Sequence, residues 1–137
     1  ARKAGLPAVI SFTVETNGAL PNGQSLADAI AEVDGATGQY PAYYMVNCAH
    51  PDHFGETLLD APWARRIRGI RANASRRSHA ELDAAPELDA GNPHELAQQY
   101  RALANRMPWL NVFGGCCGSD LRHVTEIARA IAGQGAV

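Results

Sequence analysis

Four segments rich in β-branched and aromatic residues alternate along the chain with segments of helical periodicity, and no other pattern in the sequence limits the possible folds as strongly. The expected strands cover residues 8–14, 42–48, 67–72 and 109–113. Strands that alternate strictly with helices pair in parallel and are joined by right-handed crossovers. We therefore expect an α/β fold of four βα units, which corresponds to the second half of a (β/α)₈ barrel. An isolated four-stranded parallel sheet is the alternative.

Capping residues predict where the helices begin and end. Ser25 and Asn92 each precede an apolar helical stripe and can accept hydrogen bonds from its first turn, and Pro93 suits the first helical position. We expect Gly35 and Gly38 to end the first helix and Ser119 to cap the last one. Between them, residues 50–59 should form a short helix carrying Phe54, Leu58 and Leu59, and residues 73–91 a long loop.

Composition and charge exclude several classes of function. The 137 residues are 46% hydrophobic and 19% charged, as is typical of a soluble globular domain. A formal net charge of −2 provides no basic surface for nucleic acid. No apolar run approaches the roughly 18 residues that cross a bilayer, and the N-terminus has no signal-peptide pattern. We expect a cytoplasmic protein that binds neither nucleic acid nor membranes.

Three cysteines provide the strongest functional signal. Cys48 ends the second expected strand, and Cys116 and Cys117 follow the fourth between glycines. Because the carboxyl ends of parallel strands meet at one edge, all three thiols are expected on the side where such folds carry their active sites. An odd number of cysteines cannot pair completely, and in a reducing compartment metal binding or catalysis is the expected use. Gly114, Gly115 and Gly118 give the backbone freedom to turn both adjacent thiols toward one point.

Three thiolates fit an incomplete tetrahedral zinc site, and an open fourth position is typical of a catalytic zinc. A substrate thiol bound there would lose its proton and become a nucleophile suited to attack a methyl group. We therefore predict one Zn²⁺ bound by Cys48, Cys116 and Cys117. The alternatives are buried cysteines that act as small hydrophobic residues, and a vicinal disulfide or metal-free redox dithiol formed by Cys116 and Cys117.

The sequence Gly-Gly-Cys-Cys-Gly at 114–118, together with Asn47-Cys48, resembles the zinc motifs of the homocysteine S-methyltransferases, a family of (β/α)₈ barrels. The resemblance extends along the chain: residues 10–13 resemble the fifth strand of the family barrel, residues 23–26 the start of the following helix, and residues 71–75 the Asn-containing segment after the seventh strand. It implies small-molecule substrates, with a methyl group transferred to homocysteine to give methionine. The donor would be S-methylmethionine, S-adenosylmethionine, betaine or a corrinoid.

Other polar residues at strand ends are candidates for substrate binding. Glu15, after the first strand, could bind the amino group of an amino acid. Asn47 and Asn73 could orient a ligand or a zinc-bound sulfur, although Asn commonly satisfies loop backbone instead. The five histidines have no metal-ligand spacing, and we expect them to lie away from this rim.

Four βα units also predict an incomplete barrel. The first and last strands would each leave an unpaired edge, and apolar residues such as Val9, Ile10 and Phe12 occupy both faces of the first strand. Residues 1–7 have the character of the end of a helix and its following loop. We expect either a segment of a longer polypeptide whose N-terminal half is missing, or a zinc-binding half-barrel that self-associates or needs a partner segment and is inactive alone.

Overall fold

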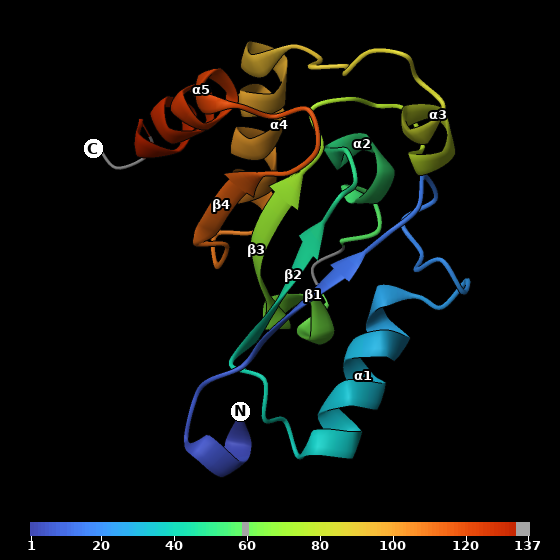
Figure 1. Ribbon diagram of the computed structural model, residues 1–137. Coiled ribbons are helices and arrows are strands. Elements are labelled where there is room, and N and C mark those ends of the chain that lie inside the picture. The colour runs from blue at the N-terminus through green and yellow to red at the C-terminus, as the bar shows by residue number, and fades with distance from the viewer. Residues whose placement is uncertain (59–60, 134–137) are drawn as a thin grey trace.

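Four strands form one parallel sheet in the order β1-β2-β3-β4, so strands that are neighbours in sequence are also neighbours in space (Figure 1). This computed structural model describes residues 1–58 and 61–133. The predicted α/β fold is confirmed, and a sequential parallel sheet is compatible with half of a (β/α)₈ barrel. The strands are β1 (Val9–Thr13), β2 (Tyr43–Asn47), β3 (Ile67–Ala72) and β4 (Val112–Gly115).

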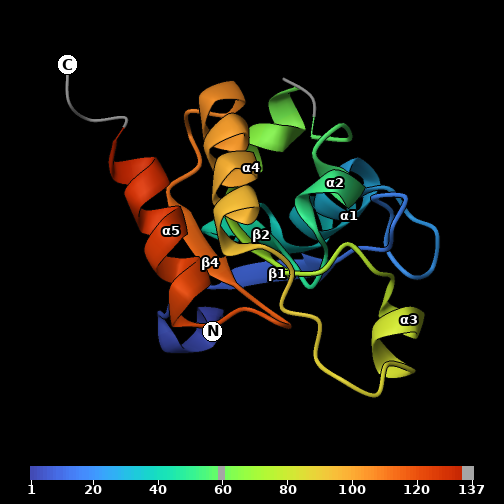
Figure 2. The ribbon, with the colours of Figure 1, turned by 90° about the horizontal axis from the view of Figure 1, so that it is seen from above.

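Helices cover one face of this sheet. Figure 2 shows α1, α2 and α4 on the same side, with α5 beside α4 at the β4 edge. None of the helices in the described ranges combines the length and apolar character that a membrane span requires. The helices are η1 (Arg2–Ala4), α1 (Leu26–Thr37), α2 (Pro51–Phe54), η2 (Pro62–Arg66), α3 (His79–Asp83), α4 (Pro93–Arg106) and α5 (Leu121–Ala132).

The core lies between the helices and one face of the sheet. Alternate residues of the two central strands point into it and are fully buried, and burial of this apolar surface is the main force that holds the layers together. From the helical layer, Phe54, Leu96 and Tyr100 pack against these strand residues. The buried strand residues are Tyr44, Val46, Ile70 and Ala72.

The opposite face of the sheet is less apolar than the sequence suggested. Ser11 is paired across β2 with Met45 and Gly69, and the next row on this face contains Asn47 beside Arg71. Ser11 and Arg71 are exposed, whereas Met45 lies flat over Gly69, where an added Cβ would come within 2.6 Å of the Met45 Cε. The expectation of apolar residues on both faces is therefore wrong for the rows nearest the carboxyl ends of the strands.

Several helix boundaries follow the capping residues as predicted. Ser25 accepts a hydrogen bond from the Asp28 amide, and Asn92 accepts from the first turn of α4. Only Gly38 ends α1, in a left-handed conformation with φ of 60°, while Gly35 lies within the helix. The short helix predicted over 50–59 is confirmed only for Pro51–Phe54, which form α2. Leu58 is buried but follows the end of this helix, and Leu59 lies outside the described residues.

Other boundaries differ from the sequence prediction. The fourth strand begins at Val112 rather than Trp109, because Trp109 lies in a turn closed by a hydrogen bond from the Leu110 amide to the Met107 carbonyl. Asp120, not Ser119, caps α5. The expected loop over 73–91 contains α3, whose start is fixed by a capping box in which the Ser78 and Glu81 side chains each bond to the other residue's backbone N–H.

Candidate metal centre

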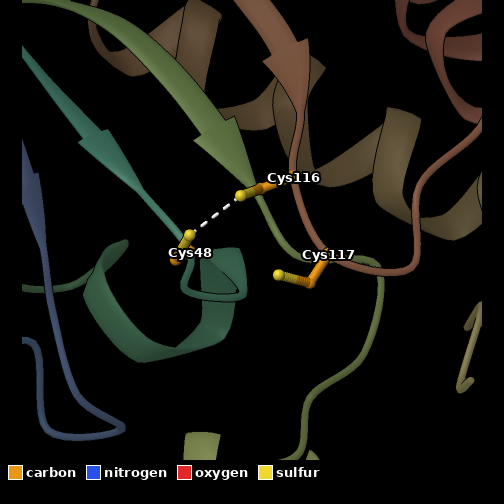
Figure 3. Close-up of side chains that lie close together, drawn as sticks. All are labelled: Cys48, Cys116 and Cys117. Carbon is orange, nitrogen blue, oxygen red and sulfur yellow. Dashed lines mark hydrogen bonds between the residues drawn. The ribbon is translucent and has the colours of Figure 1, made fainter.

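The three cysteine sulfurs lie within 4.8 Å of one another at the carboxyl edge of the sheet (Figure 3). Cys48 directly follows β2, and Cys116 and Cys117 directly follow β4, so the cluster spans the end of β3. The Sγ atoms of Cys48 and Cys116 are 2.8 Å apart. All three cysteines are free, so the structure does not contain the vicinal disulfide that was considered as an alternative.

The end of β3 positions both cysteine segments through its main chain. The Cys48 amide donates to the Arg71 carbonyl, and the Cys116 amide donates to the Ala72 carbonyl. Cys48 also adopts a left-handed backbone conformation with φ of 55°, which costs a non-glycine residue about 1–2 kcal/mol. Of the three glycines expected to free the Cys116–Cys117 backbone, only Gly118 has a positive φ.

Asn73 joins the two cysteine segments through its side chain. Its Nδ2 donates to the Cys48 carbonyl at 2.9 Å, and its Oδ1 accepts from the Cys117 amide at 3.1 Å. The residue is only 2% exposed. These contacts favour a positioning role for Asn73, while its predicted contact with substrate stays a prediction.

The other two residues predicted to bind substrate lie at neighbouring strand ends. Asn47 accepts a hydrogen bond from the Ser11 hydroxyl at 2.6 Å and donates to the Thr13 hydroxyl at 3.1 Å, so its side chain joins β2 to β1. Glu15, two residues after β1, is partly exposed. Its Oε1 lies 3.3 Å from His79 Nδ1.

His79 is a site residue that the sequence did not indicate. Its Nε2 contacts the Cys48 carbonyl, so the expectation that no histidine lies at this rim is wrong for this residue. The hydrogen bond to that carbonyl and the nearby Glu15 carboxylate raise the pKa of His79, although burial opposes them. The capping box at Ser78 and Glu81 was the available signal, since it predicts a helix that begins at His79 in the segment after β3.

Two buried histidines serve the fold instead. His50 caps α2 by accepting from the Asp52 amide, and burial lowers the pKa of His50 to about 4. His123 accepts from the Asp120 amide through Nδ1 and contacts the Ala90 carbonyl through Nε2 at 2.7 Å. Both rings therefore interact with backbone groups of the fold.

A cavity of about 500 Å³ opens beside the thiols, which is within the usual size range of small-molecule sites. Cys48, Cys117 and Asn73 contribute to its lining from the strand ends. The segment after β3 supplies the opposite wall, which is mixed apolar and acidic. That wall comprises His79, Leu82, Asp83, Glu87, Leu88 and Asp89.

The three thiols differ in acidity because they lie so close together. Burial, followed by the hydrogen bond with Cys116, raises the pKa of Cys48 to about 11. Burial and the neighbouring Cys116 charge raise the pKa of Cys117. For Cys116, burial opposes ionisation, but hydrogen bonds from the Cys48 thiol and the Cys117 backbone outweigh it and lower the pKa. The cluster thus favours one thiolate, and three would need a cation to offset their repulsion.

The cluster fits a soft divalent metal. Zinc–sulfur bonds of ~2.3 Å in a tetrahedron place sulfur atoms about 3.8 Å apart. One pair of sulfurs here is 2.8 Å apart and no pair is more than 4.8 Å apart, so the three sulfurs are near enough to share one ion. An all-sulfur donor set also suits zinc better than magnesium or calcium, which prefer oxygen ligands.

Three thiols converge at the carboxyl ends of the strands of a parallel sheet. The protein is therefore an α/β protein with a candidate metal centre of three thiolates. The family model for homocysteine S-methyltransferase matches residues 1–131. The chain therefore belongs to the homocysteine S-methyltransferase family, whose members act on small-molecule substrates. No curated protein and no solved structure was found to match the chain.

Proposed function

We propose that this protein binds one Zn²⁺ through Cys48, Cys116 and Cys117 and transfers a methyl group to homocysteine, giving methionine. The observation that carries the proposal is the convergence of these three sulfurs, beside a cavity, in a chain that belongs to this family. The donor would be S-methylmethionine, S-adenosylmethionine, betaine or a similar methyl compound. A reducing, cytoplasmic location would keep the three thiols available.

Some residues of this chain would hold the metal, and others would orient the substrate. When bound, zinc supplies a Lewis acid that keeps a substrate thiol deprotonated at neutral pH. The three cysteines hold the ion, and Asn73 fixes the backbone on both sides of it. Glu15 offers a carboxylate at the rim for the ammonium group of homocysteine. Alignment of the two substrates in the cavity would supply most of the remaining rate enhancement.

The alternative is a zinc-binding half-barrel that is inactive unless a partner segment completes it. The sheet order favours this possibility, because β1 and β4 are both edge strands and each leaves backbone groups available for pairing. Such a module would bind zinc with the same three cysteines. It would differ from the first proposal only in turnover.

Homocysteine-dependent turnover tests the proposed function directly. Zinc-loaded protein is incubated with homocysteine and each donor in turn, and methionine is measured by mass spectrometry. We expect methionine with at least one donor, and we expect it to disappear when homocysteine is omitted or a chelator removes the zinc. One bound equivalent of zinc without methionine from any donor would favour the half-barrel module instead.

Zinc affinity is expected to rise steeply with pH. The raised pKa values of Cys48 and Cys117 keep both thiols protonated at neutral pH, whereas the lowered pKa of Cys116 favours its thiolate. Zinc binding must therefore release at least two protons, so its affinity should increase about 100-fold per pH unit. Competition with a chromophoric chelator at several pH values, corrected for protonation of the chelator, measures this slope. A slope below about tenfold per unit would contradict the assignment.

A further inference from the structure

The carbonyl oxygen of Cys48 is contacted by two side chains from the segment that follows β3. Asn73 Nδ2 donates to it at 2.9 Å, and His79 Nε2 contacts the same oxygen. Cys48 is one of two described non-glycine residues with a positive φ, the other being Gln39. The orientation of the Cys48 peptide decides where its thiol points, so these two contacts bear directly on the geometry of the centre.

The second nitrogen of the His79 ring faces the end of β1. Its Nδ1 lies 3.3 Å from Glu15 Oε1. The imidazole thus connects a carboxylate that follows β1 to a cysteine that follows β2, over sequence separations of 64 and 31 residues. It also lines the cavity beside the thiols.

The local sequence fixes where this imidazole lies. His79 is the first residue of α3, and the Ser78–Glu81 capping box sets the start of that helix. The segment carrying α3 is anchored at its beginning by Asn73, whose side chain is bonded to both cysteine segments. His79 is therefore presented to Cys48 by a short segment that is hydrogen-bonded at both of its ends.

We propose that His79 is a positioning residue of the metal centre. It holds the Cys48 peptide in the left-handed conformation that turns the thiol toward Cys116, and it holds Glu15 at the rim where an ammonium group would bind. The inference rests on the proposed zinc-dependent function. His79 is thus a residue outside the three cysteines that connects metal binding to amino-acid recognition.

Cobalt binding provides the test, because thiolate-to-cobalt charge-transfer bands report the ligand set without any turnover. We expect His79→Ala to weaken Co²⁺ binding by roughly 10–100-fold and to shift these bands. His79→Gln should recover most of the affinity, since its amide can still donate to the Cys48 carbonyl. His94→Ala is the matched control: His94 is exposed in the first turn of α4 and contacts the side chains of Glu126 at 3.6 Å and Gln98 at 3.4 Å, so this variant should bind like the wild type.

Unchanged Co²⁺ affinity and spectrum in His79→Ala would overturn the inference. If that variant fails to fold, Ser78→Ala replaces it, because it removes the α3 cap without altering any group that contacts the cysteines. Weaker Co²⁺ binding by Ser78→Ala would then support the role of His79, and wild-type binding would refute it. A wild-type protein that binds no Co²⁺ would count against the metal centre itself, whereas wild-type binding with unaltered variants would count against His79 alone.

Discussion

Replacement of any one of Cys48, Cys116 and Cys117 by serine is expected to lower zinc affinity by at least about 100-fold. A structural zinc site contributes about 10–16 kcal/mol in total, so one ligand in three or four accounts for on the order of 3 kcal/mol. Serine nearly preserves the shape of cysteine, but its hydroxyl is a harder ligand and does not ionise near neutral pH. Metal content by mass spectrometry and chelator competition both measure the loss.

A control must separate loss of a ligand from loss of stability. Ser25→Ala removes the N-cap of α1, which costs about 1 kcal/mol of stability, at a position remote in sequence from the cysteines. It should lower the melting temperature and leave zinc affinity unchanged. A cysteine variant that retained one equivalent of zinc at wild-type affinity would show that this cysteine is not a ligand.

Asn73→Ala is expected to damage both the fold and the centre. It removes the bond to the Cys48 carbonyl and leaves the Cys117 amide without its partner, and a buried unsatisfied group costs about 1–3 kcal/mol. Because the same side chain orients two candidate ligands, zinc affinity should also fall by roughly 10–100-fold. Urea unfolding of the metal-free protein and chelator competition measure the two effects separately.

Two further asparagine variants sharpen this prediction. Asn73→Asp keeps the acceptor for the Cys117 amide but places a carboxylate oxygen against the Cys48 carbonyl, so it should bind zinc no better than Asn73→Ala. Asn22→Ala is the matched control, because the Asn22 side chain is exposed in the loop before α1 and accepts from the Gln24 amide. If Asn22→Ala weakened zinc binding as much as Asn73→Ala, the bridging role of Asn73 would be refuted.

Local patterns in the sequence were sufficient to predict the fold class and the convergence of the thiols. The β3 boundaries, Ile67–Ala72, match the prediction, although only Ile67 and Ile70 in this segment are β-branched. Ser25 and Asn92 cap their helices as expected because capping depends on only three or four consecutive residues. The thiols converge because both cysteine segments follow parallel strands, whose carboxyl ends share one edge.

The residues around the thiols were harder to predict because their contacts are non-local. His79 contacts Glu15, which is 64 residues away in the sequence. The contact depends on the path of the segment after β3 along the rim, and the hydrophobic periodicity of the sequence does not predict that path. Asn73 could have faced substrate or backbone, and only the fold shows that it bonds to both cysteine segments. The late start of β4 had a local cause, since Trp109 has strand propensity but lies in a turn closed by the Leu110 amide and the Met107 carbonyl.

The distance in sequence between Cys48 and Cys116, 68 positions, has a thermodynamic consequence. A metal ion that joined them would close a loop containing β3, α3 and α4, and in the unfolded chain such closure costs entropy that grows with the logarithm of loop length. Because the unfolded chain would seldom bring the three sulfurs together, the ion would bind mainly the folded state and stabilise it by mass action. Its removal would weaken the segments between Cys48 and Cys116 most directly, while β1, α1, β2 and α5 lie outside the loop.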